Sequence, residues 1–342
     1  MKQYKRNVLL CTGGSGGHVF PALSIFLTSS MFSNRMFITI DRKVFKYVKF
    51  RKHFIFSIVV LTFKESSAFS FDLMTLLIKS FFLKIRYIIF FGSYTNVILL
   101  LMSLVLNLSI FIHEQNIFFG QINVICSLFA KKIFVSFPSK KISKKHLLFG
   151  LPIVFKNFLF VTKKKTNNLK IFVIGGSQGA LIFNNVIPQT ILTISRIFST
   201  QIYITQQIQH KYIGKIVNSY FKIKNICSLH TFYKNVFLLY SLTDITLSRS
   251  GASTIVELIL LDKLSITVPY FYSKNNHQFY NSKFVKKNSD LILIEESFFS
   301  HDFFVILICK LLVNYKELLL LKKMTLPKFR RINFFSVFKF IK

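Results

Sequence analysis

Short runs of β-branched and aromatic residues alternate along this chain with longer segments whose apolar positions recur at helical spacing. In the first half, the runs with strand character are Asn7–Cys11, Met36–Ile40, Phe54–Leu61, Tyr87–Phe91, Leu108–His113 and Lys132–Phe137. In the second half, they are Lys170–Ile174, Gln201–Thr205, Asn225–Leu229, Asp244–Ser248, Leu264–Val268 and Leu291–Ile294. Strands that alternate with helices are typical of βα units, which build parallel sheets. The pattern therefore predicts an α/β protein with one parallel sheet in each half.

The polar, lysine-rich segment Lys163–Asn168 separates the two halves and has the composition of a linker. A chain of 342 residues also favours two domains of ordinary size over one. We therefore expect one domain over residues 1–162, a second over 163–325 and a tail over 326–342.

The charge balance points to anionic partners. The chain has 46 Lys and Arg against 12 Asp and Glu, a net charge of +34, which suits nucleic acid, phosphorylated substrates or an anionic membrane. The cations are scattered, however, and no zinc-finger, helix-turn-helix or RNA-binding signature is present, so we expect no nucleic-acid partner. Part of the charge also fits a genome whose codons favour Lys and Phe.

Cysteine usage and hydropathy predict a location in a reducing compartment. The four cysteines lie far apart with no C-x-x-C pair, which is typical of thiols in a cytoplasm. The apolar run before the first glycines has the four residues VLLC, too few for a signal peptide. The longest apolar stretch, Val97–Ile112, is interrupted by polar residues and is shorter than the roughly 20 residues of a spanning helix.

Two glycine-rich loops, CTGGSGGH (Cys11–His18) and IGGSQGA (Ile174–Ala180), each follow an expected strand and precede an expected helix. The N-terminus of a helix presents unpaired N–H groups and a positive dipole end, so such turns can bind phosphate. Neither loop matches the dinucleotide or P-loop consensus, and either one alone could be a structural turn. Two of them, one in each half, favour a ligand beyond the carboxyl ends of the strands.

Two further segments place polar groups at the ends of expected strands. In SRSGASTIVEL (Ser248–Leu258), Glu257 lies where the two acceptor oxygens of a carboxylate could bind a sugar diol, the alternative being a solvated helix glutamate. FIHEQN (Phe111–Asn116) ends an apolar strand in four polar residues, which require hydrogen-bond partners if buried. These are either ligand contacts or a structural network.

Five motifs, TGGSGGHVFPAL, HEQN, GGSQGA, SRSGASTIVEL and HQFYNS, occur in an order and spacing that resemble the MurG family, from about Asn7 to Ser282. Members of this family are the bacterial N-acetylglucosaminyltransferases that complete the lipid-linked peptidoglycan precursor. The resemblance implies the GT-B glycosyltransferase fold, in which two Rossmann-like parallel-sheet domains face a cleft. The first domain would bind the acceptor and the membrane, the second the UDP-sugar, and the tail would return to the first domain.

The resemblance implies an inverting transfer of N-acetylglucosamine from UDP-N-acetylglucosamine to the 4-hydroxyl of the muramoyl sugar of lipid I, which gives lipid II. It implies no cofactor and no metal, and a peripheral position on the cytoplasmic leaflet of the bacterial inner membrane. Two alternatives remain: another UDP-sugar enzyme of the same fold, such as an epimerase or glycolipid synthase, or an inactive membrane-associated copy.

Site residues follow from the same motifs. His18 would be the catalytic base, since a histidine can accept a proton near neutral pH, although it could instead only hydrogen-bond a phosphate or the loop. The positions that match donor contacts are Ser15, Gly16, Gly17, Asn116, Ser177, Tyr233, Ala252, Ser253, Thr254, Glu257, Gln278 and Asn281. The candidate acceptor contacts are Tyr94, His113 and Glu114.

Two positions depart from the family pattern. Where the family has an arginine in NPVR, this chain has Val154 in LPIV, and valine makes no bidentate contact to phosphate. Lys156 could replace that charge. The segment FFGSYT has also lost one glycine of the family's GGY pattern.

The stretch Ser70–Phe90 is a candidate membrane contact. Its apolar spacing predicts a helix through at least Arg86, with a stripe that includes Phe81 and Ile85 and a second apolar face that includes Leu83. Lys79, Lys84 and Arg86 flank these faces and would meet lipid headgroups. The alternative is that both apolar faces pack into a core. The basic tail Lys322–Lys342 is a second candidate.

Overall fold

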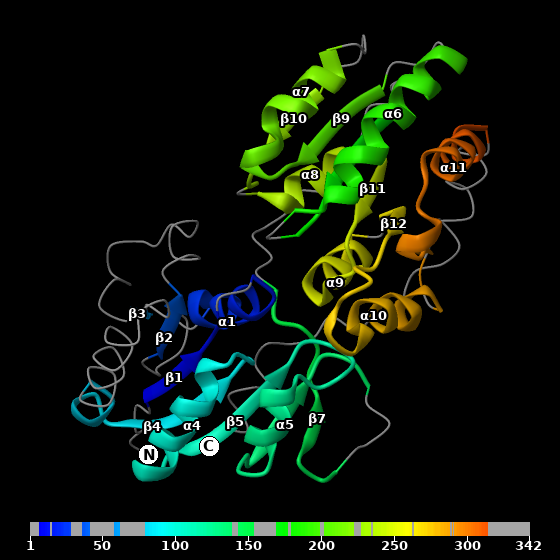
Figure 1. Ribbon diagram of the computed structural model, residues 1–342. Helices are drawn as coiled ribbons and strands as arrows, with labels where there is room; N and C mark the ends of the chain where they lie inside the picture. The colour runs from blue at the N-terminus through cyan, green and yellow to red at the C-terminus, as the bar shows by residue number, and fades with distance from the viewer. Residues whose placement is uncertain are drawn as a thin grey trace. The chain divides into compact units, whose positions relative to one another are not determined.

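A computed structural model describes residues 7–13, 16–28, 36–41, 58–61, 79–138, 143–153, 169–176, 179–198, 202–221, 227–233, 235–261, 263–287, 289 and 291–313 (Figure 1). These residues divide into two compact units, one before and one after residue 154. The expected linker Lys163–Asn168, Lys156 and the tail over 326–342 lie outside the described residues, as does the basic segment Lys322–Lys342.

The described strands of the first unit form one parallel sheet in the order β3-β2-β1-β4-β5-β6-β7. They are β1 (Asn7–Cys11), β2 (Met36–Asp41), β3 (Ile58–Leu61), β4 (Ile85–Phe90), β5 (Ser109–Glu114), β6 (Lys132–Val135) and β7 (His146–Leu148). Six of these were expected from the sequence and lie within a few residues of their predicted positions. The seventh, β7, has three residues and no fully buried one, so it left no apolar pattern to detect.

The helices of the first unit cover both faces of the sheet. Alternate residues of a strand point to opposite faces, and β1 is buried on both. Val8 and Leu10 pack in one core cluster with α1 (Gly16–Thr28). Leu9 and Cys11 pack in a second cluster with α4 (Thr95–Val105) and α5 (Gln121–Ser127). Burial on two faces explains why the strand sequence is a continuous apolar run.

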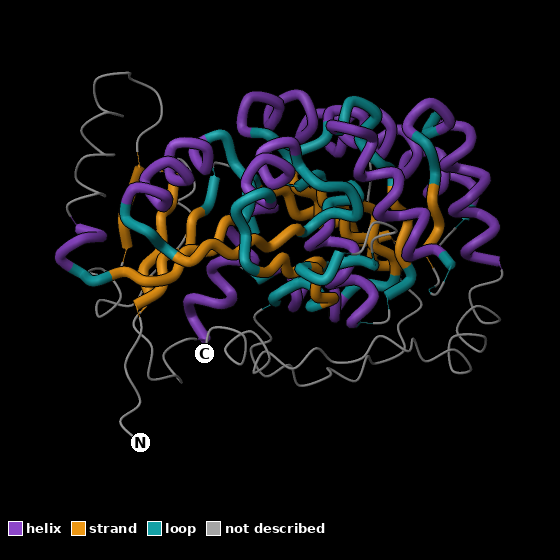
Figure 2. The backbone as a smooth tube through the Cα atoms, turned by 90° about the horizontal axis from the view of Figure 1, so that it is seen from below, coloured by secondary structure: helices purple, strands orange, loops and turns teal. Residues whose placement is uncertain are grey.

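The second unit has its own parallel sheet, in the order β10-β9-β8-β11-β12-β13. Its strands are β8 (Leu169–Ile174), β9 (Ile202–Gln207), β10 (Cys227–His230), β11 (Ile245–Ser248), β12 (Ser265–Thr267) and β13 (Leu291–Leu293). Its helices are α6 (Leu181–Ile197), α7 (Ile213–Phe221), α8 (Val236–Leu242), α9 (Ala252–Leu260), α10 (His277–Lys286) and α11 (His301–Val313). The tube trace shows these helices lying beside the strands (Figure 2). The expected strands of this half are all confirmed.

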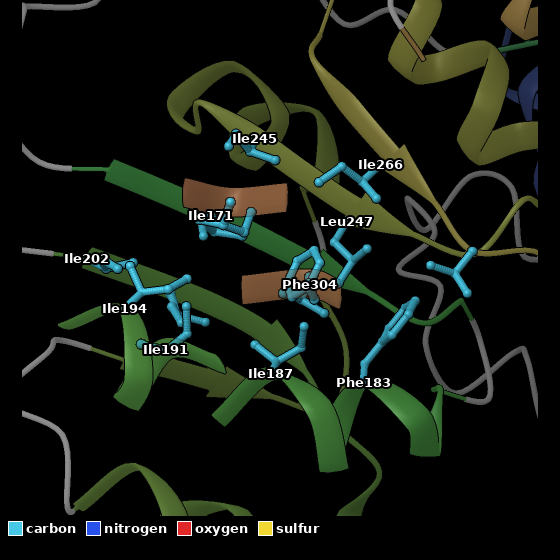
Figure 3. Close-up of a cluster of buried hydrophobic side chains, with 14 of the residues drawn as sticks. Ile171, Phe183, Ile187, Ile191, Ile194, Ile202, Ile245, Leu247, Ile266 and Phe304 are labelled. Atoms are coloured by element: carbon cyan, nitrogen blue, oxygen red, sulfur yellow. The ribbon is translucent and has the colours of Figure 1, made fainter. Parts of the chain in front are cut away.

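One apolar cluster joins this sheet to several helices, α6 and α11 among them. Phe183, Ile187 and Ile191 recur every four residues along α6 and so lie on one face of that helix. They pack with Phe304 of α11 and with strand residues that include Leu247, as Figure 3 shows. This packing fixes the strand ends from which the site residues project.

The prediction of a helix through Arg86 is wrong. Residues 79–82 are helical, and residues before 79 in that stretch lie outside the described residues. The helix ends in a turn where Lys84 has a φ of 49°, and Ile85 then begins β4, paired with Asn7 of β1. Phe81 is 71% exposed whereas Ile85 is buried, so the two do not form one stripe. Helical spacing in a short apolar run does not exclude a strand, and here pairing with β1 decides.

Candidate functional site

The first glycine loop connects β1 to α1 and places His18 in the first turn of the helix. Gly16 and Gly17 begin α1, while Ser15 lies outside the described residues. The Nδ1 atom of His18 lies at hydrogen-bond distance from the carbonyl oxygen of Phe91. A carbonyl only accepts, so Nδ1 carries a proton, and in the neutral ring the lone pair is then on Nε2. This is the tautomer that a general base requires.

A second loop, between β4 and α4, packs against His18. Gly92 has a φ of +87°, and a Cβ there would lie 2.9 Å from Cε1 of His18, so no other residue fits. The Oγ atom of Ser93 would lie 2.5 Å from a Cβ at Gly13, so the neighbouring first loop is also crowded at that glycine. The chain therefore keeps glycine at Gly92, where the backbone requires it. Tyr94 follows and is 77% exposed.

His113 and Glu114, expected as acceptor contacts, are instead buried in a structural network. Glu114 accepts hydrogen bonds from the backbone N–H groups of Asn116 and Gly120, both at 3.0 Å, and from Nδ2 of Asn123 at 2.8 Å. Nε2 of His113 hydrogen-bonds the carbonyl of Gly150 at 3.0 Å. Both residues are 1% exposed, and hydrogen bonds within the first unit account for both side chains, as the structural alternative for these two residues predicts.

Burial also determines the charge state of His113. Its ring stacks on Phe91, with centroids 5.4 Å apart. Removal from water disfavours the imidazolium and lowers the pKa of His113 to about 4, a shift that the bond to Gly150 only partly offsets. His113 is therefore neutral at physiological pH. The network holds Asn116, whose main-chain and side-chain N–H groups both donate to Glu114.

The second glycine loop connects β8 to α6. Gly176 and Gly179 have φ values of +81° and +70°, which favour glycine, and a Cβ at Gly175 would lie 2.3 Å from the backbone nitrogen of Ala180. Ser177 lies outside the described residues. The glycines of GGSQGA are thus required by the turn that delivers the chain to the N-terminus of α6, a 17-residue helix.

The third loop connects β11 to α9. Gly251 is the N-cap of α9 and gives no side-chain hydrogen bond, so the first N–H groups of the helix, around Ala252 and Thr254, are left for a ligand. The Oγ atom of Ser253 is buried there without a hydrogen-bond partner. An uncapped helix start beside an unpaired hydroxyl is suited to bind phosphate oxygens.

Glu257 lies on α9 next to the buried Tyr240. Burial raises the pKa of Glu257 to about 8, and the Tyr240 hydroxyl acts in the opposite direction. Burial also raises the pKa of Tyr240 above its ordinary value. Glu257 is half-buried on α9, and a half-buried carboxyl beside a buried phenol suits a contact to a ligand hydroxyl better than it suits a solvated helix glutamate.

Three other expected donor contacts are tied into the second unit. The Tyr233 hydroxyl lies 3.1 Å from the carbonyl of Gln206 and 3.2 Å from that of Ser228. Oε1 of Gln278 accepts from the backbone N–H of Tyr270 at 3.0 Å, which leaves its amide N–H groups for other partners. Asn281 is fully buried, with Nδ2 3.5 Å from the carbonyl of Ser250, so its side chain contacts the loop that precedes α9.

Sequence reasoning missed Arg249, which is 9% exposed and forms an ion pair with Glu296 at 2.7 Å. The available signal was an arginine placed directly after a buried strand, where a charge requires a partner. The partner lies 47 residues away, and no local pattern reveals it.

The described ranges contain no group of three or more His, Cys, Asp or Glu residues placed to hold a metal ion. Among the helices that the structure describes, none has the length and apolar character needed to cross a bilayer.

Two α/β units, each built on a parallel sheet, are the architecture of the GT-B class of glycosyltransferases. Two solved structures have this fold. MurG of Acinetobacter baumannii matches with a TM-score of 0.73 and 20% identity, over 98% of this chain and 99% of that one. A UDP-N-acetylglucosamine 2-epimerase matches with a TM-score of 0.62 and 11% identity, over 92% of this chain and 89% of that one. The models for the N-terminal and C-terminal domains of glycosyltransferase family 28 match residues 8–135 and 170–319. The chain belongs to glycosyltransferase family 28.

Two curated relatives share the name "UDP-N-acetylglucosamine--N-acetylmuramyl-(pentapeptide) pyrophosphoryl-undecaprenol N-acetylglucosamine transferase". The relative from Wolbachia sp. subsp. Drosophila simulans (strain wRi) is 30% identical over 304 residues, 85% of each chain. That from Rickettsia canadensis (strain McKiel) is 31% identical over 304 residues, 82% of this chain and 83% of the other. The resemblance to the MurG family is confirmed.

Proposed function

We propose that this chain transfers N-acetylglucosamine from UDP-N-acetylglucosamine to the 4-hydroxyl of the muramoyl sugar of lipid I, with inversion, and so forms lipid II for peptidoglycan. The observation that carries the proposal is the match to relatives with this named activity over most of the chain, through both domains of family 28.

His18 is proposed as the base. Its Nδ1–H is directed at the Phe91 carbonyl, so Nε2 can take the proton of the acceptor hydroxyl. The deprotonated oxygen then attacks the anomeric carbon from the side opposite UDP, the bond to the diphosphate breaks, and the configuration inverts. The proton rests on His18 at the end of the step.

The second unit is proposed to hold the donor. The N-termini of α6 and α9 would bind the diphosphate and stabilise the charge that develops on the leaving UDP. Glu257 would accept hydrogen bonds from the ribose hydroxyls. The amide N–H groups of Gln278 would donate hydrogen bonds to the transferred sugar. Ser15, Ser177 and the departure at Val154 lie outside the described residues, and their roles remain those that the family resemblance implies.

The lipid-linked acceptor requires a membrane contact, and we place it on the first unit at the cytoplasmic leaflet. Exposed apolar side chains lie on the short helical segment before β4 (Phe81 and Phe82), on α4 (Leu101 and Val105), on α5 (Val124) and directly after α5 (Leu128 and Phe129). Lys79, Lys84 and Arg86 are exposed around the same turn. Apolar patches rimmed by cations are typical of peripheral binding to anionic lipid.

Transfer of radiolabelled sugar from UDP-N-acetylglucosamine to lipid I, with no added metal, tests the activity. Wild type and His210→Ala, a control at an exposed histidine, should form product at similar rates. His18→Ala should form product much more slowly. A reaction that converts the donor when lipid I is omitted would identify an epimerase and refute the proposal.

Co-sedimentation with anionic vesicles tests the membrane contact. Changing Lys79, Lys84 and Arg86 together to Glu should weaken binding, since each cation near an anionic surface contributes about 1 kcal/mol. The matched control changes the exposed Lys283, Lys286 and Lys287 of the second unit. Equal losses in both triple variants would mean that net charge, and not this surface, drives binding.

A further inference from the structure

Arg249 follows β11 directly, and its guanidinium is almost entirely buried. Nη1 donates to the carbonyls of Val268 and Pro269 at 3.1 and 3.2 Å, and Nη2 donates to Oε1 of Glu296 at 2.7 Å. The second carboxylate oxygen, Oε2 of Glu296, accepts from the backbone N–H of Phe271 at 2.9 Å. The two side chains together therefore fix the backbone from residue 268 to residue 271.

The guanidinium also lies against two aromatic rings, with its carbon 5.3 Å from the centroid of Phe183 and 5.2 Å from that of Tyr270. Phe183 belongs to the apolar core of the second unit (Figure 3) and packs on Phe299. Arg249 is thus anchored in the core by one ring and contacts the 268–271 segment through the other.

This segment leads to a residue proposed to bind the donor sugar, because the backbone N–H of Tyr270 donates to Oε1 of Gln278. On the other side, the backbone N–H of Arg249 donates to the carbonyl of Ile174 at the end of β8, and α9 with Glu257 begins three residues after Arg249. Through its backbone N–H and its side chain, Arg249 therefore connects the carboxyl ends of neighbouring parallel strands, the edge at which such sheets bind ligands.

We propose that Arg249 is a positioning residue for selection of the donor sugar. With Glu296 it holds the segment that carries Gln278 in register with α9, so that the sugar and the nucleotide are bound at a fixed separation. The inference rests on the proposed function, since it takes UDP-N-acetylglucosamine as the donor. Arg249 does this without touching the donor, and a lysine cannot replace it because an ammonium lacks the planar set of donors that meets two carbonyls and a carboxylate together.

Calorimetric binding of UDP, UDP-N-acetylglucosamine and UDP-glucose to the full chain tests this. In Arg249→Lys, the affinity for UDP should stay within about twofold of the wild-type value. The ratio of the affinities for UDP-N-acetylglucosamine and UDP-glucose should fall about 10- to 100-fold, because a group misplaced by about 1 Å can cost an effect of this order. Glu296→Gln should reproduce the loss in part. Arg196→Lys, at an exposed position on α6, is the matched control and should change neither value.

An equal loss of UDP and UDP-N-acetylglucosamine affinity in Arg249→Lys would overturn the proposal, because the residue would then bind the nucleotide or phosphates. An unchanged sugar preference in both Arg249→Lys and Glu296→Gln would also overturn it. If Arg249→Lys does not fold, Glu296→Gln decides alone. If the wild-type chain prefers UDP-N-acetylglucosamine but transfers nothing to lipid I, the proposed function is refuted and the test of Arg249 still stands. If the wild-type chain shows no such preference, the proposed role of Arg249 is overturned.

Discussion

The affinity of this chain for UDP-N-acetylglucosamine should rise with pH through Glu257. Burial holds the pKa of this carboxyl at about 8, so in the free protein it is mainly protonated at neutral pH. A protonated carboxyl carries a donor that competes with the ribose hydroxyls, whereas the carboxylate offers acceptors alone. The sugar nucleotide should therefore select the ionised form, and binding should release a proton.

The size of the effect follows from the pKa. If only the ionised form binds, the apparent association constant is proportional to the ionised fraction, about 1% at pH 6, about 9% at pH 7 and about 90% at pH 9. Affinity should rise about tenfold from pH 6 to pH 7 and level off above pH 8, a total of roughly 90-fold. At pH 7, binding should release about 0.9 proton.

Titration calorimetry in buffers of different ionisation enthalpy measures both quantities. UDP-N-acetylglucosamine is a better ligand than UDP for this purpose, because its diphosphate has no group that titrates near neutrality. Glu257→Gln should bind with an affinity independent of pH, because an amide at this position does not titrate. A flat profile for wild type, or an undiminished slope in Glu257→Gln, would refute the assignment.

Three further predictions concern the first unit. His18→Ala should lower kcat about 10²- to 10⁴-fold with donor affinity unchanged, and a collapse of donor affinity at normal kcat would make His18 a binding residue. Glu114→Ala should lower the free energy of unfolding in urea by at least about 2 kcal/mol, because it leaves buried N–H donors unpaired; wild-type stability would contradict this. The pKa of His113 is about 4 in the folded protein and 6.5 is its ordinary value, so between pH 4 and pH 6.5 the unfolded chain binds more protons than the folded one. The free energy of unfolding should therefore fall as the pH is lowered across this range. His113→Phe should lack this pH dependence.

Much of the fold is determined by local sequence. A strand such as β1, buried on both faces, must be apolar throughout, and the turns at Gly92, Gly176 and Gly179 accept no other residue without strain. These constraints act within a few residues, so strand positions and the two glycine loops were readable directly. The same loops, with HEQN and SRSGAST, sufficed to identify the family.

Local pattern failed where contacts distant in sequence decide the outcome. Ile85 fits a helical stripe with Phe81, yet it pairs with β1 because that pairing buries it. His113 and Glu114 have the chemistry of ligand contacts, and only their burial by surrounding elements makes them structural.

The chemistry of the site shows the same division. The sequence by itself placed a histidine at a helix start and a glutamate on α9, because motif spacing is a local property. Tertiary structure decided that the Phe91 carbonyl, 73 residues from His18, fixes its tautomer, and that burial beside Tyr240 raises the pKa of Glu257. It also paired Arg249 with Glu296. Proton positions and desolvation depend on which atoms the fold brings into contact, and a linear pattern does not contain that information.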